Sequence, residues 1–303
     1  MAVHRTDHNG SIDKIRERFS EISITKAFFI ALFSLIPFGI ALLILNFREI
    51  LTGFYLDLSV SIVIYLIPLA LIVYAFSKKE LNLLPILKST GQHARDMIMV
   101  VPLILFSISV IWVTILLLSL ASSDLAQGYL DFLNSIEMLE TTSESPLYHY
   151  LLLFIGVAIL PSLFEELVFR GAMVERFGRK HGFKTGVILS SVLFGILHVD
   201  VVGAIFFGVI LSLIYLKTSS LFLPILIHLI NNGLVVVFIF LDDQFLQIEP
   251  WKTTEPFITQ GWLGVVLFIA SSVWIYSYLK KNWYLVHEKE PIGRSVAEAA
   301  EST

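Results

Sequence analysis

The stretch LYHYLLLFIGVAILPSLFEELVFRG, residues 147–171, decides the fold. Its apolar part is long enough for a helix that crosses the hydrocarbon core of a bilayer, which takes about 20 residues. Near its end stand Glu165, Glu166 and Arg170, and each charge costs about 3 kcal/mol or more at membrane depth. Because an intramembrane charge is a functional candidate by default, this stretch indicates both a membrane fold and the place of a site.

The rest of the 303-residue chain agrees with a membrane fold. Hydrophobic residues make up 56% of the chain and charged residues 15%, whereas soluble domains have about 45–50% and about 25%. We therefore predict an all-α polytopic integral membrane protein. The absence of cysteine excludes disulfides, thiolate metal sites and cysteine nucleophiles. The polar first 26 residues do not resemble a secretory signal.

Eight apolar runs are candidate transmembrane helices, and two of them are short. They are residues 27–46, 57–76, 97–120, 147–169, 185–198, 201–216, 221–241 and 260–279. Of the 21 lysines and arginines, only Arg48 and Lys252 fall on the face opposite the termini. Since cytoplasmic loops are enriched in basic residues, we predict that both termini are cytoplasmic, in a bacterial plasma membrane.

Composition divides the chain into five segments. They are a cytoplasmic segment 1–26, N-terminal helices with an acidic external loop 27–146, a core with the charged residues 147–241, an external loop with the last helix 242–287, and a tail 288–303. The tail is polar and rich in small residues, so we predict that it is disordered.

The fifth and sixth runs are too short for ordinary spans. Only 13 residues lie between Lys184 and His198, and 16 lie between Asp200 and Lys217. Both flanks are cytoplasmic by charge, so we predict a short, partly buried hairpin that turns inside the protein, where irregular backbone is tolerated if it lines a cavity. Asp200 is placed to cap the sixth helix. His198 would then lie at a depth similar to that of Glu165 and His228.

Helical spacing pairs one glutamate of the charged motif and leaves the other free. Glu166 and Arg170 are four residues apart with the acid first, the favourable order for an ion pair. Glu165 points about 100° away on a helix of 3.6 residues per turn and has no local partner. An unpaired buried carboxyl is suited to work as a general base near neutral pH. Pro161, which cannot donate to the carbonyl of residue 157, predicts a bend just before this pair.

Two further motifs place polar side chains at membrane depth. Residues 194–198 read FGILH, and residues 228–232 read HLINN. His228 and Asn232 are four residues apart, so both lie on one helix face. A single His or Asn in a membrane helix is more often a hydrogen-bonding contact between helices than a catalytic group. Two on one face, with another His and a Glu elsewhere, favour a site.

These residues resemble the CPBP family, the CAAX-protease and bacteriocin-processing group of intramembrane endopeptidases that includes type II CAAX prenyl endopeptidases. The family's motifs EExxxR, FxxxH and HxxxN occur in order at residues 165–170, 194–198 and 228–232. The resemblance covers about residues 147–241, and no motif position is missing. It implies a peptidase that activates water within the lipid bilayer, with a peptide or membrane protein as substrate.

The resemblance also implies a role for each motif residue. Glu165 would take a proton from the attacking water, and His198 would help to hold that water. His228 and Asn232 would donate hydrogen bonds to the developing oxyanion. Three residues would support these groups: Glu166, Arg170 and Phe194.

Two assignments of the cofactor stay open. Glu165, His198 and His228, together with a water, would satisfy a catalytic zinc site, and the family is often labelled metallopeptidase. Against zinc, Asn232 is a poor ligand, and the HExxH motif of zinc proteases is absent. These observations favour a metal-independent, glutamate-type site, with Zn²⁺ as the alternative.

Other functions are compatible with the same residues. A transporter could use Glu, His and Arg as a proton relay, but such folds often contain paired repeats, and no second copy of the motifs occurs. A non-catalytic membrane scaffold or regulator could retain the motifs without turnover. The sequence does not indicate whether a substrate is prenylated, whether the role is peptide maturation, immunity or regulation, or what the oligomeric state is. No nucleic-acid partner is predicted.

Overall fold

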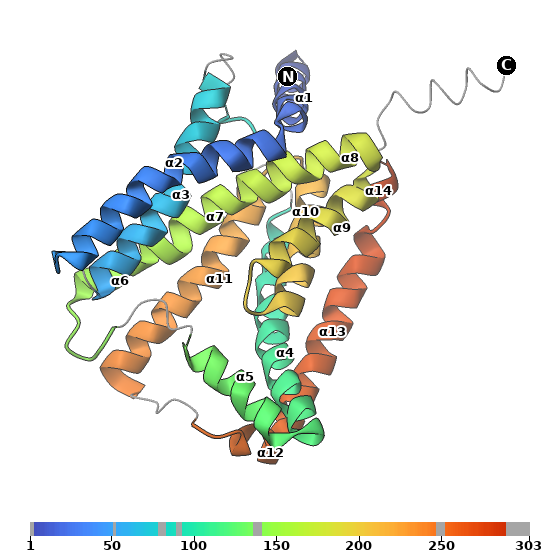
Figure 1. Cartoon of the computed structure of the whole chain (residues 1–303). Helices are drawn as coiled ribbons and strands as arrows, with labels where there is room; N and C mark the ends of the chain where they lie inside the picture. The colour runs from blue at the N-terminus through green and yellow to red at the C-terminus, as the bar shows by residue number, and fades with distance from the viewer. Residues whose placement is uncertain are drawn as a thin grey trace.

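The computed structural model describes residues 3–50, 53–77, 83–88, 93–135, 141–246 and 252–288, and these ranges contain helices and no strand. The elements are α1 (Val3–Glu21), α2 (Ile24–Phe47), α3 (Gly53–Ser77), η1 (Ala94–Met99), α4 (Val100–Ala121), α5 (Ser123–Ser135), α6 (Leu147–Leu153), η2 (Phe154–Ile159), α7 (Leu160–Glu166), η3 (Leu167–Val174), α8 (Glu175–His181), α9 (Phe183–Ile196), α10 (Val201–Thr218), α11 (Phe222–Leu241), η4 (Asp242–Leu246), α12 (Glu255–Thr259), α13 (Gly261–Asn282) and α14 (Leu285–Glu288) (Figure 1). Of the predicted disordered tail 288–303, Glu288 is the last residue of α14, and residues 289–303 lie outside the described residues.

The predicted all-α polytopic membrane fold is confirmed. Six helical segments of the described chain are long and apolar enough to cross a membrane: Gly53–Tyr74, Ala94–Ala121, Leu147–His181, Val201–Thr218, Phe222–Leu246 and Gly261–Asn282. Two shorter apolar helical segments, Leu35–Phe47 and Phe183–Ile196, accompany them. Each of the eight predicted apolar runs is therefore helical, and the run before His198 is short, as expected.

One continuous helix, formed by α6, η2, α7, η3 and α8, carries the charged motif. Its 35 residues extend about 50 Å at 1.5 Å per residue, which exceeds the roughly 30 Å of a hydrocarbon core. The helix thus continues beyond the apolar run 147–169 as far as His181, and the chain turns only at Gly182, whose φ of 88° favours glycine. The segment η2 before Pro161 is π-helical, which is one way to accommodate the missing proline N–H.

The two helices of the predicted hairpin, α9 and α10, pack against each other, but only α9 is short, because α10 is long enough to cross a membrane. α9 has 14 residues, and 67% of the apolar window in α10 is buried inside the protein. The two helices approach closely where glycine leaves room: a Cβ on Gly195 would lie 2.8 Å from the carbonyl oxygen of Val201, and a Cβ on Gly208 would lie 2.9 Å from Cβ of Ser191. Asp200 caps α10, accepting a hydrogen bond from the Gly203 N–H at 3.0 Å, as predicted.

The N-terminal helix α1 packs against the long helix at α8 and η3. Its buried apolar residues Ile12, Ile15 and Phe19 follow the three- and four-residue spacing of one helix face. Phe19 lies directly over Gly171, where a Cβ would come within 2.9 Å of the Phe19 ring. Part of the segment 1–26 therefore packs beside the helix that carries the charged motif.

The helices that carry the three motifs meet around the central helix α10. A buried apolar cluster joins η3, α9, α10 and α11 and includes Phe169, Phe194, Phe207 and Ile227. Figure 1 shows α2 and α3 running beside the long helix, and α3 contacts it at α7. The site therefore lies between α3, the long helix, the end of α9 and α11.

Candidate active site

The structure brings together three side chains that the sequence predicted to converge. Glu165 lies in α7, His198 follows α9, and His228 lies in α11. The Oε2 atom of Glu165 is 3.8 Å from Nε2 of His198 and 3.8 Å from Nε2 of His228. The glutamate and His228 are buried, whereas 36% of the His198 side chain is exposed. His198 therefore marks the side from which water or a substrate can reach Glu165.

The hydrogen bonds of the two imidazole rings fix which nitrogen carries the proton in the neutral form. Nδ1 of His198 is 2.7 Å from the carbonyl oxygen of Phe194, which can only accept a hydrogen bond. Nδ1 of His228 is 2.8 Å from Oε1 of Glu166. Both Nδ1 atoms are therefore donors, and both neutral rings present an unprotonated Nε2 to Glu165.

Three hydrogen-bond acceptors thus converge on one small space. Oε2 of Glu165 has no hydrogen-bond partner among the described residues, and neither Nε2 is close enough to donate to it. A water molecule about 2.8 Å from Oε2 of Glu165 and from one Nε2 fits a separation of 3.8 Å and can donate one hydrogen to each. With Glu165 and Glu166 ionised and Arg170 positive, the cluster carries one net negative charge.

Glu166 and Arg170 form the predicted ion pair. Nη1 of Arg170 donates to Oε1 of Glu166 at 2.6 Å, and both side chains are completely buried. The same Oε1 accepts from His228, so the pair also orients that imidazole. Oε2 of Glu166 and two guanidinium nitrogens of Arg170 have no hydrogen-bond partner among the described residues.

The ring of Phe194 contacts both histidines and Arg170. Its ring stacks on His198 with centroids 4.2 Å apart and meets His228 edge-on at 5.9 Å. The Arg170 guanidinium carbon lies 4.6 Å from the centre of the same ring, a cation–π contact. These contacts are those of a packing residue, and the ring lies against both imidazoles.

Asn232 is engaged with the long helix rather than with Glu165. Its Nδ2 donates to the carbonyl oxygen of Val157 at 3.0 Å, and its Oδ1 accepts from Asn231 at 3.1 Å. Val157 is four residues before Pro161, whose missing N–H leaves that carbonyl without the usual helical donor. Asn232 thus anchors α11 to the π-helical segment η2, and it retains one amide hydrogen for another acceptor.

Sequence reasoning missed one contact of Glu165. Tyr65 in α3 donates its hydroxyl to Oε1 of Glu165 at 3.1 Å, and its ring meets Phe164 edge-on at 5.8 Å. Tyr65 is one of two tyrosines in the apolar run 57–76 and is a weak signal, because tyrosine is frequent in membrane proteins near the interfaces. The contact required the packing of α3 on α7, which no local pattern specifies.

Whether the three converging side chains could hold zinc depends on their spacing. Tetrahedral ligands about 2.1 Å from zinc lie about 3.4 Å apart, closer than the two separations of 3.8 Å. No group of three His, Asp or Glu side chains in the described part of the chain has the geometry to hold a metal ion. As arranged, the residues do not fit a zinc ion, although the ligand types are suitable.

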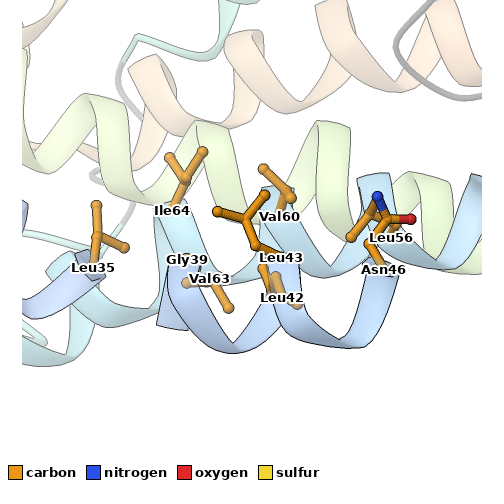
Figure 2. A pocket seen from close by; sticks show the side chains of 9 residues that line it. All are labelled: Leu35, Gly39, Leu42, Leu43, Asn46, Leu56, Val60, Val63 and Ile64. Atoms are coloured by element: carbon orange, nitrogen blue, oxygen red, sulfur yellow. The ribbon is translucent and has the colours of Figure 1, made fainter. Parts of the chain in front are cut away.

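An apolar groove of about 350 Å³ lies apart from this cluster. Figure 2 shows the side chains of α2 and α3 that line it: Leu35, Gly39, Leu42, Leu43, Asn46, Leu56, Val60, Val63 and Ile64. None of the motif residues is among them. Its lining suits an alkyl chain, and it has no group that could perform chemistry.

Known proteins match the part of the chain that builds the site. Residues 147–234 match the model of a family described as type II CAAX prenyl endopeptidase Rce1-like. The membrane-embedded CAAX protease MroQ of Staphylococcus aureus (strain USA300) is 37% identical over 108 residues. YdiL of Bacillus subtilis (strain 168), which carries the name of a membrane peptidase, is 29% identical over 102 residues. The resemblance drawn from the three motifs is confirmed.

The matches are local. Each alignment includes 33% of this chain and spans 42% of MroQ or 38% of YdiL, so the chain covers less than half of the length of these curated relatives. No solved structure matches the chain at a significant level. The helices α1 to α5 and α12 to α14 lie outside the residues that match the family model.

Proposed function

We propose that this integral membrane protein is an intramembrane endopeptidase that hydrolyses a peptide bond with a water activated by Glu165. The observation that carries this proposal is the convergence of Glu165 Oε2 with Nε2 of His198 and His228, each 3.8 Å away. Three acceptors around one space suit a water that gives up a proton. The match of residues 147–234 to a peptidase family supports the same reaction class.

The proposed reaction begins with the water between Glu165 and His198. Glu165 takes one water proton at Oε2, and the water oxygen forms a bond to the carbonyl carbon of the peptide. The carbonyl becomes an oxyanion. The C–N bond then breaks, and the proton held by Glu165 passes to the leaving nitrogen, so that the products are a carboxyl group and an amine. His198 holds the water through its Nε2 acceptor.

His228 and Asn232 are proposed to stabilise the oxyanion under two conditions. Nδ1 of His228 already donates to Glu166, so Nε2 can donate only when the ring is an imidazolium, a form that Glu166 stabilises by its charge. Asn232 can donate only its second amide hydrogen, because the first is bound to Val157. Each preorganised donor contributes about 3 kcal/mol to barrier reduction in sites of this kind.

The proposed site works without a metal ion. The spacing of its candidate ligands is wider than tetrahedral zinc requires, and the charge of Glu166 is paired with Arg170 rather than with a divalent cation. The test is hydrolysis of one identified peptide after dialysis against a strong chelator and after addition of Zn²⁺. Activity that is unchanged by the chelator supports the glutamate-type site, whereas loss with chelator and recovery with Zn²⁺ supports the zinc alternative.

We place both termini and the site opening on the cytoplasmic face of a bacterial plasma membrane. The distribution of basic residues supports this orientation, and Arg176, Arg179 and Lys180 follow the site within the same helix. Single cysteines, for which this cysteine-free chain provides a clean background, test it. A cysteine at position 181 should react with a membrane-impermeant thiol reagent only after the cells are opened.

The proposed activity is tested by comparing cells that contain wild-type protein with cells that contain Glu165→Gln protein at equal abundance. The substitution preserves the side-chain volume and removes the base. We expect membrane-protein termini and released peptides that are present with the wild type to be absent with the variant. Identical peptide maps, with any biological phenotype retained, would instead support a non-catalytic scaffold or regulator.

A further inference from the structure

The hydroxyl of Tyr65 reaches the site from a helix that lies outside the segment matched to the peptidase family. Tyr65 is in α3, and the match begins at residue 147. Its hydroxyl donates to Oε1 of Glu165 at 3.1 Å. Its ring is fixed by an edge-on contact with Phe164 at 5.8 Å. The hydroxyl therefore occupies a defined position beside the glutamate.

This contact makes the two oxygens of Glu165 different. Oε1 accepts from Tyr65, whereas Oε2 faces the two histidines and has no hydrogen-bond partner among the described residues. The last torsion of a glutamate side chain is broad and roughly two-fold, so a carboxylate without a donor can rotate. The neutral histidines cannot prevent this rotation, because their Nε2 atoms are acceptors.

The position of α3 links this contact to the rest of the molecule. Ile64, next to Tyr65, lines the groove between α2 and α3 (Figure 2), while Tyr65 contacts α7. Of the side chains that the structure describes, Tyr65 is the one whose hydroxyl donates to Glu165. The direction of the carboxylate thus depends on the packing of α3 against α7.

We propose that Tyr65 is a positioning residue for the reaction: its hydroxyl fixes Oε1 of Glu165 and so keeps Oε2 directed at the water site between His198 and His228. This inference rests on the proposed peptidase function. Tyr65 does not contact the water site in this arrangement, so its effect passes through Glu165. Its loss should reduce the rate of the chemical step more than the binding of substrate.

The test uses full-length Tyr65→Phe protein, which retains the ring contact with Phe164 and loses only the hydroxyl. Tyr74→Phe is the matched control, since Tyr74 is in the same helix and 64% exposed. With a peptide identified by the Glu165→Gln comparison, we expect kcat to fall about 10- to 100-fold in Tyr65→Phe. KM should be unchanged, and the control should match the wild type.

A second measurement needs no substrate. The infrared difference spectrum between wild-type and Glu165→Gln protein isolates the carboxyl band of Glu165, and the same difference taken in the Tyr65→Phe background should show that band displaced. An undisplaced band overturns the proposal, as does a displaced band with unchanged kcat. Failure of the peptidase function itself is distinguished by a peptide map that is identical for wild type and Glu165→Gln, whatever the infrared result.

Discussion

The long helix Leu147–His181 buries acidic side chains at two levels, and their surroundings differ. Near its C-terminal end, Glu175 is fully buried and both of its oxygens are occupied. Its Oε1 accepts from Arg16 at 2.7 Å and from Tyr215 at 2.8 Å, and its Oε2 accepts from Arg179 at 3.3 Å. We call these four residues the Glu175 cluster. It joins α1, α8 and α10, and its carboxylate has donors on both oxygens.

At the level of the candidate site, several buried polar atoms are not hydrogen-bonded. Oε2 of Glu165, Oε2 of Glu166 and two nitrogens of Arg170 have no hydrogen-bond partner among the described residues. Buried polar groups are nearly always hydrogen-bonded in folded proteins, so unsatisfied ones require an explanation. We infer that the Glu175 cluster stabilises the fold, whereas Oε2 of Glu165 is left available for water.

The largest expected effect comes from breaking the ion pair within the site. Arg170→Met leaves the completely buried Glu166 without its cation, and such a change costs about 3–5 kcal/mol of stability. The free energy of unfolding in mixed micelles measures the loss. The exposed Lys180 offers the control Lys180→Met, which should be near neutral. Wild-type stability in Arg170→Met would show that the ion pair is dispensable for the fold. The site would then differ from the Glu175 cluster in more than its unpaired atoms.

A substitution in the Glu175 cluster should lower the stability of the fold and leave turnover nearly unchanged. Glu175→Gln removes the charge that Arg16 and Arg179 contact, and hydrogen bonds to charged groups contribute about 1.5–3 kcal/mol each. We expect α1 to separate from α8, which a single cysteine at position 15 reports by faster reaction with a thiol reagent. Turnover per folded molecule should stay within about threefold of the wild type. A loss of turnover as large as that of Glu165→Gln would place Glu175 in the site.

Phe194 provides an intermediate case, because it is an apolar residue that orients polar ones. Phe194→Leu retains an apolar side chain but loses the stack on His198 and the cation–π contact with Arg170, worth about 1–2 kcal/mol together. Reoriented imidazoles should lower kcat by about tenfold, as expected when a residue that holds a catalytic group is changed. Phe206→Leu, at a partly buried ring of the same core, is the control. Equal kcat values for the two variants would contradict the orienting role.

Local patterns were sufficient to predict the parts of the site that depend on spacing within one helix. The four-residue separation of Glu166 and Arg170 predicted their ion pair, and the unusual shortness of the run before His198 predicted the hairpin. That shortness also predicted convergence with Glu165, because a full span would have placed His198 at the opposite surface. These inferences succeeded because length and helical period are properties of the chain itself.

The rest depends on packing between distant segments, which one sequence does not specify. Tyr65 and Glu165 are 100 residues apart, and the docking of α1 through Arg16 depends on partners in α8 and α10. The continuation of the long helix beyond residue 169 was missed because charged residues suggested a solvated loop. In the structure Glu175 is instead buried by its partners. The spacing of Ile12, Ile15 and Phe19 was an available signal for α1.

The smallest expected effect is also the sharpest test of the comparison. The change in unfolding free energy caused by Glu→Gln should have opposite signs at Glu165 and at Glu175. Glu165→Gln removes a buried charge whose Oε2 has no donor, and the new amide can donate to an imidazole Nε2. The variant should therefore be more stable than the wild type by about 0.5–1 kcal/mol, as is common when a functional site is relieved of a destabilising group. Glu175→Gln, the same chemical change ten residues later, should lower stability. Unfolding free energies of both variants in the same micelles decide the matter. If both substitutions destabilise the fold equally, Glu165 supports the fold as much as Glu175 does. The unpaired atoms would then not indicate a functional site.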